Sequence, residues 1–169
     1  MNIEVENMVS KISGWHHDRN LISGSTDKNQ MLKLVQEYGE LCENTNNSLD
    51  VVDDIGDMLV VLINLAVRNN QPIFFPNSDP ITLAHVYRHT RIFVSTLSIG
   101  LFLGDLSDII CKERVHPARA IDRVVAELVV LSKYHNHTIL ECLEHSWNDI
   151  KDRKGMMVDG IFVKEDDLT

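Results

Sequence analysis

Apolar residues recur at intervals of three and four along most of this 169-residue chain, which is the period of amphipathic helices. The pattern is strongest in two segments, 28–44 and 49–68. Their apolar positions are Met31, Leu34, Val35, Tyr38, Leu41 and Cys42 in the first segment, and Ile55, Met58, Leu59, Leu62, Ile63 and Leu65 in the second. The polar stretch NTNNS between them predicts a turn, so we expect two long antiparallel helices.

The remaining segments also favour helices. VENMVSKI predicts a short helix near the start, and Pro80 begins another, because proline is favoured at the first helical position. Two further helices are expected over 91–113 and 117–135. A capping pair that starts at Thr138 begins a last helix, which ends near Gly155.

The tail MMVDGIFV carries Asp-Gly between two short apolar runs, which predicts a β-hairpin with a two-residue turn. All other signals are helical. The expected fold class is therefore all-α, with a four-helix-bundle-like core and a short C-terminal β-hairpin.

Two parts of the chain are similar to each other. DDIGDMLVVL at 53–62 can be aligned with DRVVAELVVL at 122–131, and YGELCE at 38–43 with LGDLSD at 103–108. The alternative is chance similarity between amphipathic helices. If the alignment is a repeat, 97–131 is a second helical hairpin that completes the four-helix core through Leu97, Leu101, Leu106, Val125, Leu128 and Leu131.

Composition narrows the functional classes. The formal net charge of −9 argues against a nucleic-acid or anionic-membrane surface, because both require basic patches. The three cysteines are widely spaced and form no CxxC pair, so neither a disulfide scaffold nor a zinc knuckle is expected. The N-terminus lacks a signal-peptide pattern, and no apolar run reaches the length of a membrane span. We therefore expect a cytoplasmic protein with one domain over 1–169.

Residues 36–58 combine the helical pattern with many acidic side chains and contain no Lys or Arg. Glu37 and Glu40 lie three residues apart in the first long helix, and Asp54 and Asp57 lie three apart in the second. Residues at i and i+3 share a helix face. The two acidic pairs can therefore face each other across the antiparallel helices.

Four carboxylates beside an apolar seam repel one another and lose hydration, which is costly unless a cation compensates for it. A hard divalent cation such as Mg²⁺ takes oxygen ligands and keeps positions for waters and phosphates. The pattern predicts a metal site formed by Glu37, Glu40, Asp54 and Asp57. The alternative for each pair is a solvated helix face.

These segments resemble the MazG-like members of the all-α nucleoside triphosphate pyrophosphatases. KLVQEYGELCE followed by DDIGDMLVVLINLA is similar to the family signature ExxE, spacer, ExxD, with Asp54 in place of a Glu. Gln36 also differs, because an extra Glu is common at this position in the family. WHHDRNLISGSTD and the tail WNDIKDRKGMMVDGIFVKEDD resemble the ends of short phage-type members. The resemblance covers about 10–68 and 136–167, and leaves 70–135 as an insertion or degenerate repeat.

The resemblance implies hydrolysis of a nucleoside or deoxynucleoside triphosphate to the monophosphate and pyrophosphate, by a protein that forms homo-oligomers (dimers or tetramers). Mg²⁺ or Mn²⁺ would be held by the four acids, and Glu37 or Glu40 would also orient or deprotonate the attacking water. The expected substrate-binding residues are Trp15 for the base and Lys151, Arg153 and Lys154 for the phosphates. The alternatives are an anchoring core tryptophan and solvated cations at a helix end.

Two questions stay open at this level. The first is base preference: the substrate can be a purine nucleotide such as dGTP, or the chain can be a dUTP- or dCTP-directed relative. The second is whether the chain is an enzyme, because the alternative is a non-catalytic helical interaction protein. In the aligned second hairpin, the four acidic positions are occupied by Phe102, Asp105, Arg123 and Ala126. That hairpin should bind no metal, so we expect one active centre in each chain.

Overall fold

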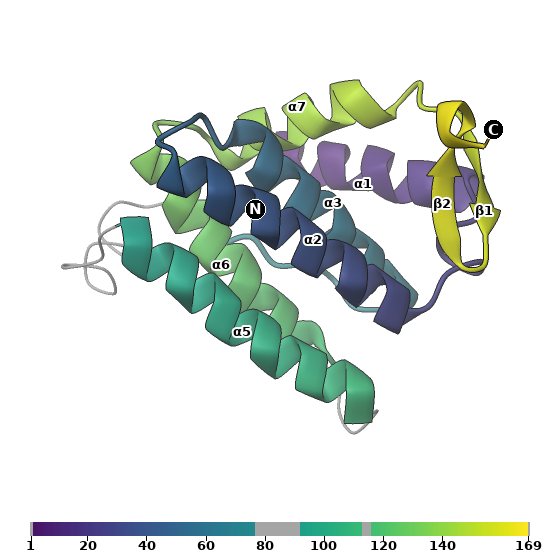
Figure 1. Ribbon diagram of the computed structural model, residues 1–169, viewed down its shortest axis with the longest axis horizontal. Helices are drawn as coiled ribbons and strands as arrows, with labels where there is room; N and C mark the ends of the chain where they lie inside the picture. Colours follow the sequence, from purple (N-terminus) through teal and green to yellow (C-terminus); the bar gives the residue numbers. More distant parts are fainter. Residues whose placement is uncertain (1, 77–91, 113–115, 169) are drawn as a thin grey trace.

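The computed structural model describes residues 2–76, 92–112 and 116–168, which form six α-helices and one two-stranded sheet (Figure 1). The helices are α1 (Ile3–Asp18), α2 (Asp27–Asn46), α3 (Val52–Arg68), α5 (Ile92–Lys112), α6 (Ala118–Tyr134) and α7 (Ile139–Ile150). The sheet is formed by β1 (Gly155–Val158) and β2 (Ile161–Lys164), and a 3-10 helix η1 (Glu165–Asp167) follows. The all-α class with a C-terminal hairpin is confirmed, and the helix predicted to begin at Pro80 lies outside the described residues. None of the helices in these ranges is long and apolar enough to span a membrane.

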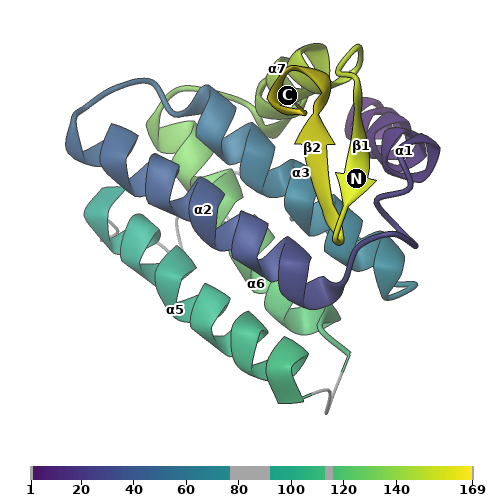
Figure 2. The ribbon, with the colours of Figure 1, turned by 45° about the vertical axis from the view of Figure 1, so that its right-hand side comes forward.

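Helix α3 lies at the centre of the molecule. It packs against α2, α7, α6 and α1 (Figures 1 and 2), so almost every side chain from Ile55 to Ala66 is buried. This explains why its sequence MLVVLINLA is apolar without interruption, because a helix that is covered on all sides has no solvated face. Burying side chains of this size stabilises the fold by about 1.5–3 kcal/mol each.

Helices α5 and α6 pack against each other, and they dock onto α2 and α3 respectively. The expected packing of the second hairpin on the first is therefore confirmed. Two members of its predicted apolar seam are wrong, because Leu97 and Leu101 are exposed. Helix α5 instead buries the opposite side, about half a turn away, formed by Ile99, Leu103, Leu106 and Ile110. Leu106 is therefore buried as expected, as are Val125, Leu128 and Leu131 of α6.

Two helix starts differ from the sequence prediction. Helix α1 begins at Ile3, two residues before the predicted segment, and Asn2 caps it by accepting a hydrogen bond from the Glu4 amide at 3.0 Å. It also continues beyond that segment, to Asp18. Helix α3 begins at Val52 rather than Leu49, and the Val52 amide donates to Asp50 Oδ1 at 3.1 Å. Helix α2 also continues to Asn46, so the turn that connects α2 to α3 covers 47–51 and lies three residues later than the predicted turn at 44–48.

The last helix ends at Ile150, earlier than predicted, and the chain then turns into the hairpin. Arg19, just after α1, fixes this turn: its guanidinium donates to the carbonyl oxygens of Arg153 at 3.0 Å and of Lys151 at 3.3 Å. These bonds satisfy carbonyl groups that a longer helix would have paired internally.

The hairpin has the predicted two-residue turn. Val158 pairs with Ile161, and both turn residues have positive φ, 50° at Asp159 and 83° at Gly160. The Asn29 side chain of α2 donates to the Gly160 carbonyl at 3.1 Å. The hairpin tip is thereby attached to the start of α2, where it borders the cavity described below.

Gly56 allows α3 to approach α7 closely, and we expect Gly56→Ala to destabilise the protein. An added Cβ would collide with Ser146 Oγ and the Cys142 carbonyl, and overpacking of this kind costs about 1–3 kcal/mol. Gly14→Ala in α1 is the matched control, because open space surrounds that position and removing a helical glycine stabilises by about 0.5–1 kcal/mol. Urea unfolding followed by circular dichroism measures both, and a Gly56→Ala midpoint equal to that of Gly14→Ala would contradict the close contact.

Candidate functional site

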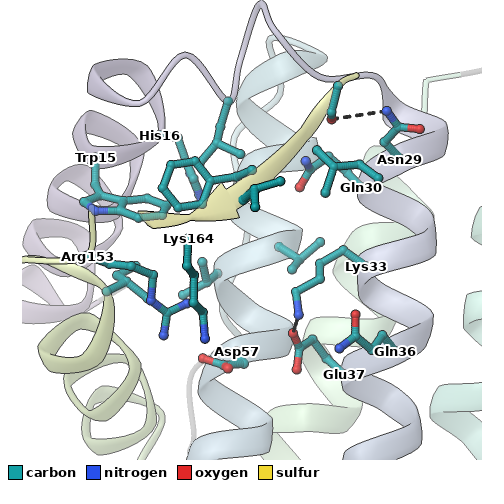
Figure 3. A pocket seen from close by; sticks show the side chains of 18 of the residues that line it. Trp15, His16, Asn29, Gln30, Lys33, Gln36, Glu37, Asp57, Arg153 and Lys164 are labelled. Carbon is teal, nitrogen blue, oxygen red and sulfur yellow. Dashed lines mark hydrogen bonds and ion pairs between the residues drawn. The ribbon is translucent and has the colours of Figure 1, made fainter. Parts of the chain in front are cut away.

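A cavity of about 510 Å³ opens between α1, α2, α3 and the hairpin (Figure 3). Helices α1, α2 and α3 contribute Trp15, His16, Asn29, Gln30, Lys33, Gln36, Glu37, Glu40, Asp57, Val60 and Val61. The other lining residues are Leu21, Ile150, Arg153 and the hairpin residues Gly160, Ile161, Phe162, Val163 and Lys164. The volume lies in the range of small-molecule sites, which is about 300–1,000 Å³.

Three of the four predicted metal ligands line this cavity: Glu37 and Glu40 from α2, and Asp57 from α3. Figure 3 shows the Glu37 and Asp57 carboxylates on neighbouring walls. Glu37 is almost fully buried, although it also forms an ion pair with Lys33 one turn earlier in α2. The antiparallel packing of α2 and α3 therefore brings acids from two helices to one end of the cavity, as predicted.

The surroundings of Glu37 and Asp57 favour the protonated forms of these two acids. Burial raises the pKa of Glu37, the nearby charges of Asp57 and Glu40 raise it further, and Lys33 opposes the change. Burial also raises the pKa of Asp57, with a further contribution from Asp53 and opposition from Arg153 and Lys33. A bound cation would reverse this balance, because it stabilises the ionised carboxylates.

Asp54, the fourth predicted ligand, is buried but does not line the cavity. Both of its carboxylate oxygens accept hydrogen bonds from Asn44 Nδ2 of α2, at 3.0 and 2.9 Å. Burial raises the pKa of Asp54, and Glu40 and Asp57 are among the charges that raise it further. Asp54 thus belongs to the same acidic region, but Asn44 occupies its oxygens.

The predicted ligands are not drawn into a tight group. Among the described residues, the set of three whose ligand atoms all lie within 4.8 Å of one another is Asp53, His145 and Asp149. These residues are exposed on α3 and α7, outside the cavity, and His145 Nδ1 lies 3.2 Å from Asp53 Oδ1. Binding a metal between Glu37, Glu40 and Asp57 would therefore require their side chains to move toward one another.

Cationic side chains face the acids across the cavity. Figure 3 shows Arg153 and Lys164 directed toward Asp57, while Lys33 pairs with Glu37 on the same wall, one turn earlier in α2. Of the three predicted phosphate-binding residues, only Arg153 lines the cavity. Lys151 donates to Asn148 Oδ1 at 2.8 Å on the surface, and Lys154 is exposed outside the cavity.

Sequence reasoning missed Lys33 and Lys164. Lys33 lies four residues before Glu37, a spacing that places both on one helix face, so the signal was present in the sequence. Lys164 lies two residues after Phe162 in β2, and alternate strand residues share a face. Only the docking of the hairpin shows that this face borders the cavity.

The other end of the cavity is aromatic. The rings of Trp15 and Phe162 meet edge to face with centroids 5.8 Å apart, and the Arg19 guanidinium carbon lies 5.0 Å from the Trp15 centroid. Trp15 is a buried core residue that also lines the cavity, and its contact with a base stays a prediction. His16 lies beside it and is uncharged at neutral pH, because burial lowers its pKa to about 3.

We expect Asp57→Asn to raise the melting temperature of the metal-free protein at neutral pH. The fold raises the pKa of Asp57, so the ionised carboxylate is less stable in the folded chain than in the unfolded chain. The resulting loss of stability is complete at pH values above the raised pKa, and it disappears as the pH falls toward the ordinary value of 3.8. The variant should melt a few degrees higher at neutral pH, since about 1 kcal/mol corresponds to 2–4 °C at this chain length.

Thermal denaturation in EDTA across a pH series measures this difference. It should be largest near neutrality and vanish once the pH is below 3.8, where Asp57 is protonated in both the folded and the unfolded chain. Asp105→Asn is the control, because the exposed Asp105 lies 3.5 Å from Arg123 and gains no stability from losing its charge. An Asp57→Asn protein that melts below the wild type at neutral pH would refute the electrostatic argument.

Fold and cavity together define an all-α protein with a C-terminal β-hairpin and a cavity of small-molecule size. No family model matches the chain, and no solved structure matches it. Over 69 residues, or 40% of this chain, it is 41% identical to an "uncharacterized 18.2 kDa protein in rep-hol intergenic region" of Haemophilus phage HP1. The match spans 42% of that phage protein, less than half of its length.

Proposed function

We propose that this chain hydrolyses a nucleoside or deoxynucleoside triphosphate to the monophosphate and pyrophosphate, with Mg²⁺ or Mn²⁺ as cofactor. One observation carries the proposal: a single cavity combines an acidic wall, facing cations and an aromatic end. The aromatic end of the cavity suits a flat base, and the charged end suits a triphosphate with its metal ion. The resemblance to MazG-like pyrophosphatases supports the same reaction.

Glu37, Glu40 and Asp57 are the residues that would hold the metal. They are crowded, and burial raises the pKa of both Glu37 and Asp57, so a divalent cation would relieve an existing repulsion. When bound, the ion supplies charge stabilisation at the phosphate oxygens. Asp54 is the fourth candidate ligand, and a cation there would compete with the Asn44 amide for its oxygens.

One of the two α2 glutamates would act on the water. Glu37 is the better candidate for a proton acceptor, because burial keeps its pKa above the ordinary glutamate value. Glu40 is exposed at the cavity edge, where it would orient the water and complete the ligand set. Lys33 would leave Glu37 and turn toward the phosphates, since its ammonium is a mobile charge on a flexible chain.

The remaining lining residues would hold the substrate. Arg153 and Lys164 would bind phosphate oxygens, and the Arg153 backbone is already fixed by Arg19. Trp15 and Phe162 would contact the base. The proposed reaction takes place in the cytoplasm, on the nucleotide pool, and the family resemblance also implies a homo-oligomer.

The direct test is a panel of ribo- and deoxyribonucleoside triphosphates incubated with purified protein and Mg²⁺ or Mn²⁺. Pyrophosphate and orthophosphate are measured separately, because only the proposed cleavage gives pyrophosphate. We expect metal-dependent pyrophosphate release that EDTA abolishes. The panel also separates a purine preference from a dUTP or dCTP preference. Absence of pyrophosphate with every nucleotide would favour the non-catalytic interaction protein.

A further inference from the structure

Four large aliphatic side chains are exposed on the outer face of α2 and α5. The exposed fractions are 70% for Leu32, 50% for Val35, 56% for Leu97 and 65% for Leu101. None of the four lines the cavity, so the proposed function does not explain them. Single exposed leucines are common, but several on adjacent helices form a patch that indicates an interface. We define these four residues as the α2–α5 patch.

The patch is continuous across the two helices. Helices α2 and α5 run antiparallel, side by side, with α3 and α6 behind them (Figure 2). Their contact is fixed by the hydrogen bond from Tyr38 Oη to the Thr96 carbonyl at 2.9 Å. Leu97 follows Thr96 directly, and Val35 precedes Tyr38 by nearly one turn. The exposed side chains of both helices therefore lie next to this contact, on the side opposite the core.

The exposed stripe of α2 is complementary to itself. It consists of Lys28, Leu32, Val35, Gly39 and Glu43, which follow at intervals of three or four residues. A two-fold axis beside Val35 would place Leu32 of one copy opposite Gly39 of the other, and Lys28 opposite Glu43. Space around Gly39 is open, since an added Cβ there would meet nothing within 4 Å. Leu32 of one copy would thus fill the open space at Gly39 of the other, and the charges of Lys28 and Glu43 would be complementary.

We propose that the α2–α5 patch is the interface of a two-fold symmetric dimer, with a second copy of this chain as its occupant. Each exposed side chain carries on the order of 100 Å² of apolar surface, so pairing two patches removes on the order of 800 Å² from water. Homodimer interfaces are about 65% apolar, so this apolar area corresponds to a total buried interface of about 1,200 Å². That area lies at the lower end of the range for stable complexes. We expect a dissociation constant in the micromolar range.

Analytical ultracentrifugation of the full chain between about 1 and 200 µM measures this equilibrium, in the range where interfaces of this size dissociate. Leu32→Asp should raise the dissociation constant at least about thirtyfold, because it places a charge within the apolar part of the interface, about one turn from the two-fold axis. Ile3→Asp in α1 is the matched control: Ile3 is 71% exposed but lies outside the patch, so dimerisation should not change. Circular dichroism verifies that both variants are folded.

A charge exchange tests the two-fold arrangement itself. Lys28→Glu and Glu43→Lys should each weaken the dimer about tenfold, because each places like charges opposite one another. The double variant Lys28→Glu with Glu43→Lys should return to within about threefold of the wild type. A chain that stays monomeric at about 200 µM, or a dimer that Leu32→Asp leaves unchanged, would overturn the proposal. A double variant as weak as the single ones would overturn the antiparallel pairing.

Discussion

Glu40→Gln and Asp57→Asn are each expected to abolish pyrophosphate release and to leave the helical circular dichroism spectrum intact. Both residues line the cavity. An amide oxygen can still accept the hydrogen bonds made to these carboxylates, from Gln36 to Glu40 and from Ser146 to Asp57. Substituting an amide keeps the shape and removes the negative charge that a divalent cation requires. We expect activity to fall by at least about a hundredfold, as is common when a metal ligand is lost.

The matched control is Asp105→Asn. Asp105 is the α5 residue aligned with Glu40, but it lies outside the cavity, 3.5 Å from Arg123. Its loss should leave activity near the wild-type level. If Glu40→Gln and Asp57→Asn both keep more than about a tenth of the activity, the acids are not metal ligands and the assignment fails. Asp57→Asn should also show the higher melting temperature described above, so a stable but inactive protein is the expected combination.

Arg153→Ala is expected to raise the apparent KM for the triphosphate by about ten- to a hundredfold. One charge-assisted hydrogen bond to a phosphate contributes about 1.5–3 kcal/mol. The Arg153 side chain is directed into the cavity toward Asp57, while its carbonyl is held by Arg19. Removing the side chain should therefore leave the turn intact and affect substrate binding. Steady-state kinetics at saturating metal measure the change.

Lys154→Ala is the control for this prediction, because Lys154 is the next residue, is exposed and does not line the cavity. We expect its KM to equal that of the wild type. Equal kinetics for Arg153→Ala and the wild type would make Arg153 a solvated cation, and substrate contact would then fall to Lys164 or Lys33. An equal rise in KM for Arg153→Ala and Lys154→Ala would indicate a general effect of positive charge on substrate binding, which added salt would reduce.

The helical part of the fold was predictable because its signals are local. A repeat of three and four residues identifies an amphipathic helix without reference to the rest of the chain. The capping box at Thr138 is likewise complete within four residues, and it forms as predicted. Helix ends were less predictable. Arg19 fixes the turn after α7 from more than a hundred residues away, and no local pattern contains that contact.

The burial of α5 also depends on contacts between residues far apart in the chain. Leu97 and Leu101 are apolar and helically spaced, so the sequence predicts that they belong to the core. Helix α5 has two apolar sides, and only its packing against α2 and α6 decides that Ile99, Leu103 and Leu106 face inward. The sequence shows which residues are apolar, whereas the partner helices determine which apolar side is covered.

The sequence by itself determined that acids on two adjacent helices would share one region, because helical spacing and a short turn leave little freedom. Tertiary structure decided which of them reach the cavity: Asn44 holds Asp54, while Glu37, Glu40 and Asp57 line the wall. The tertiary structure also determined that Arg153 and Lys164 line the cavity, whereas Lys151 and Lys154 do not. Those choices depend on where the hairpin docks against α2, a contact between residues more than a hundred positions apart in the chain.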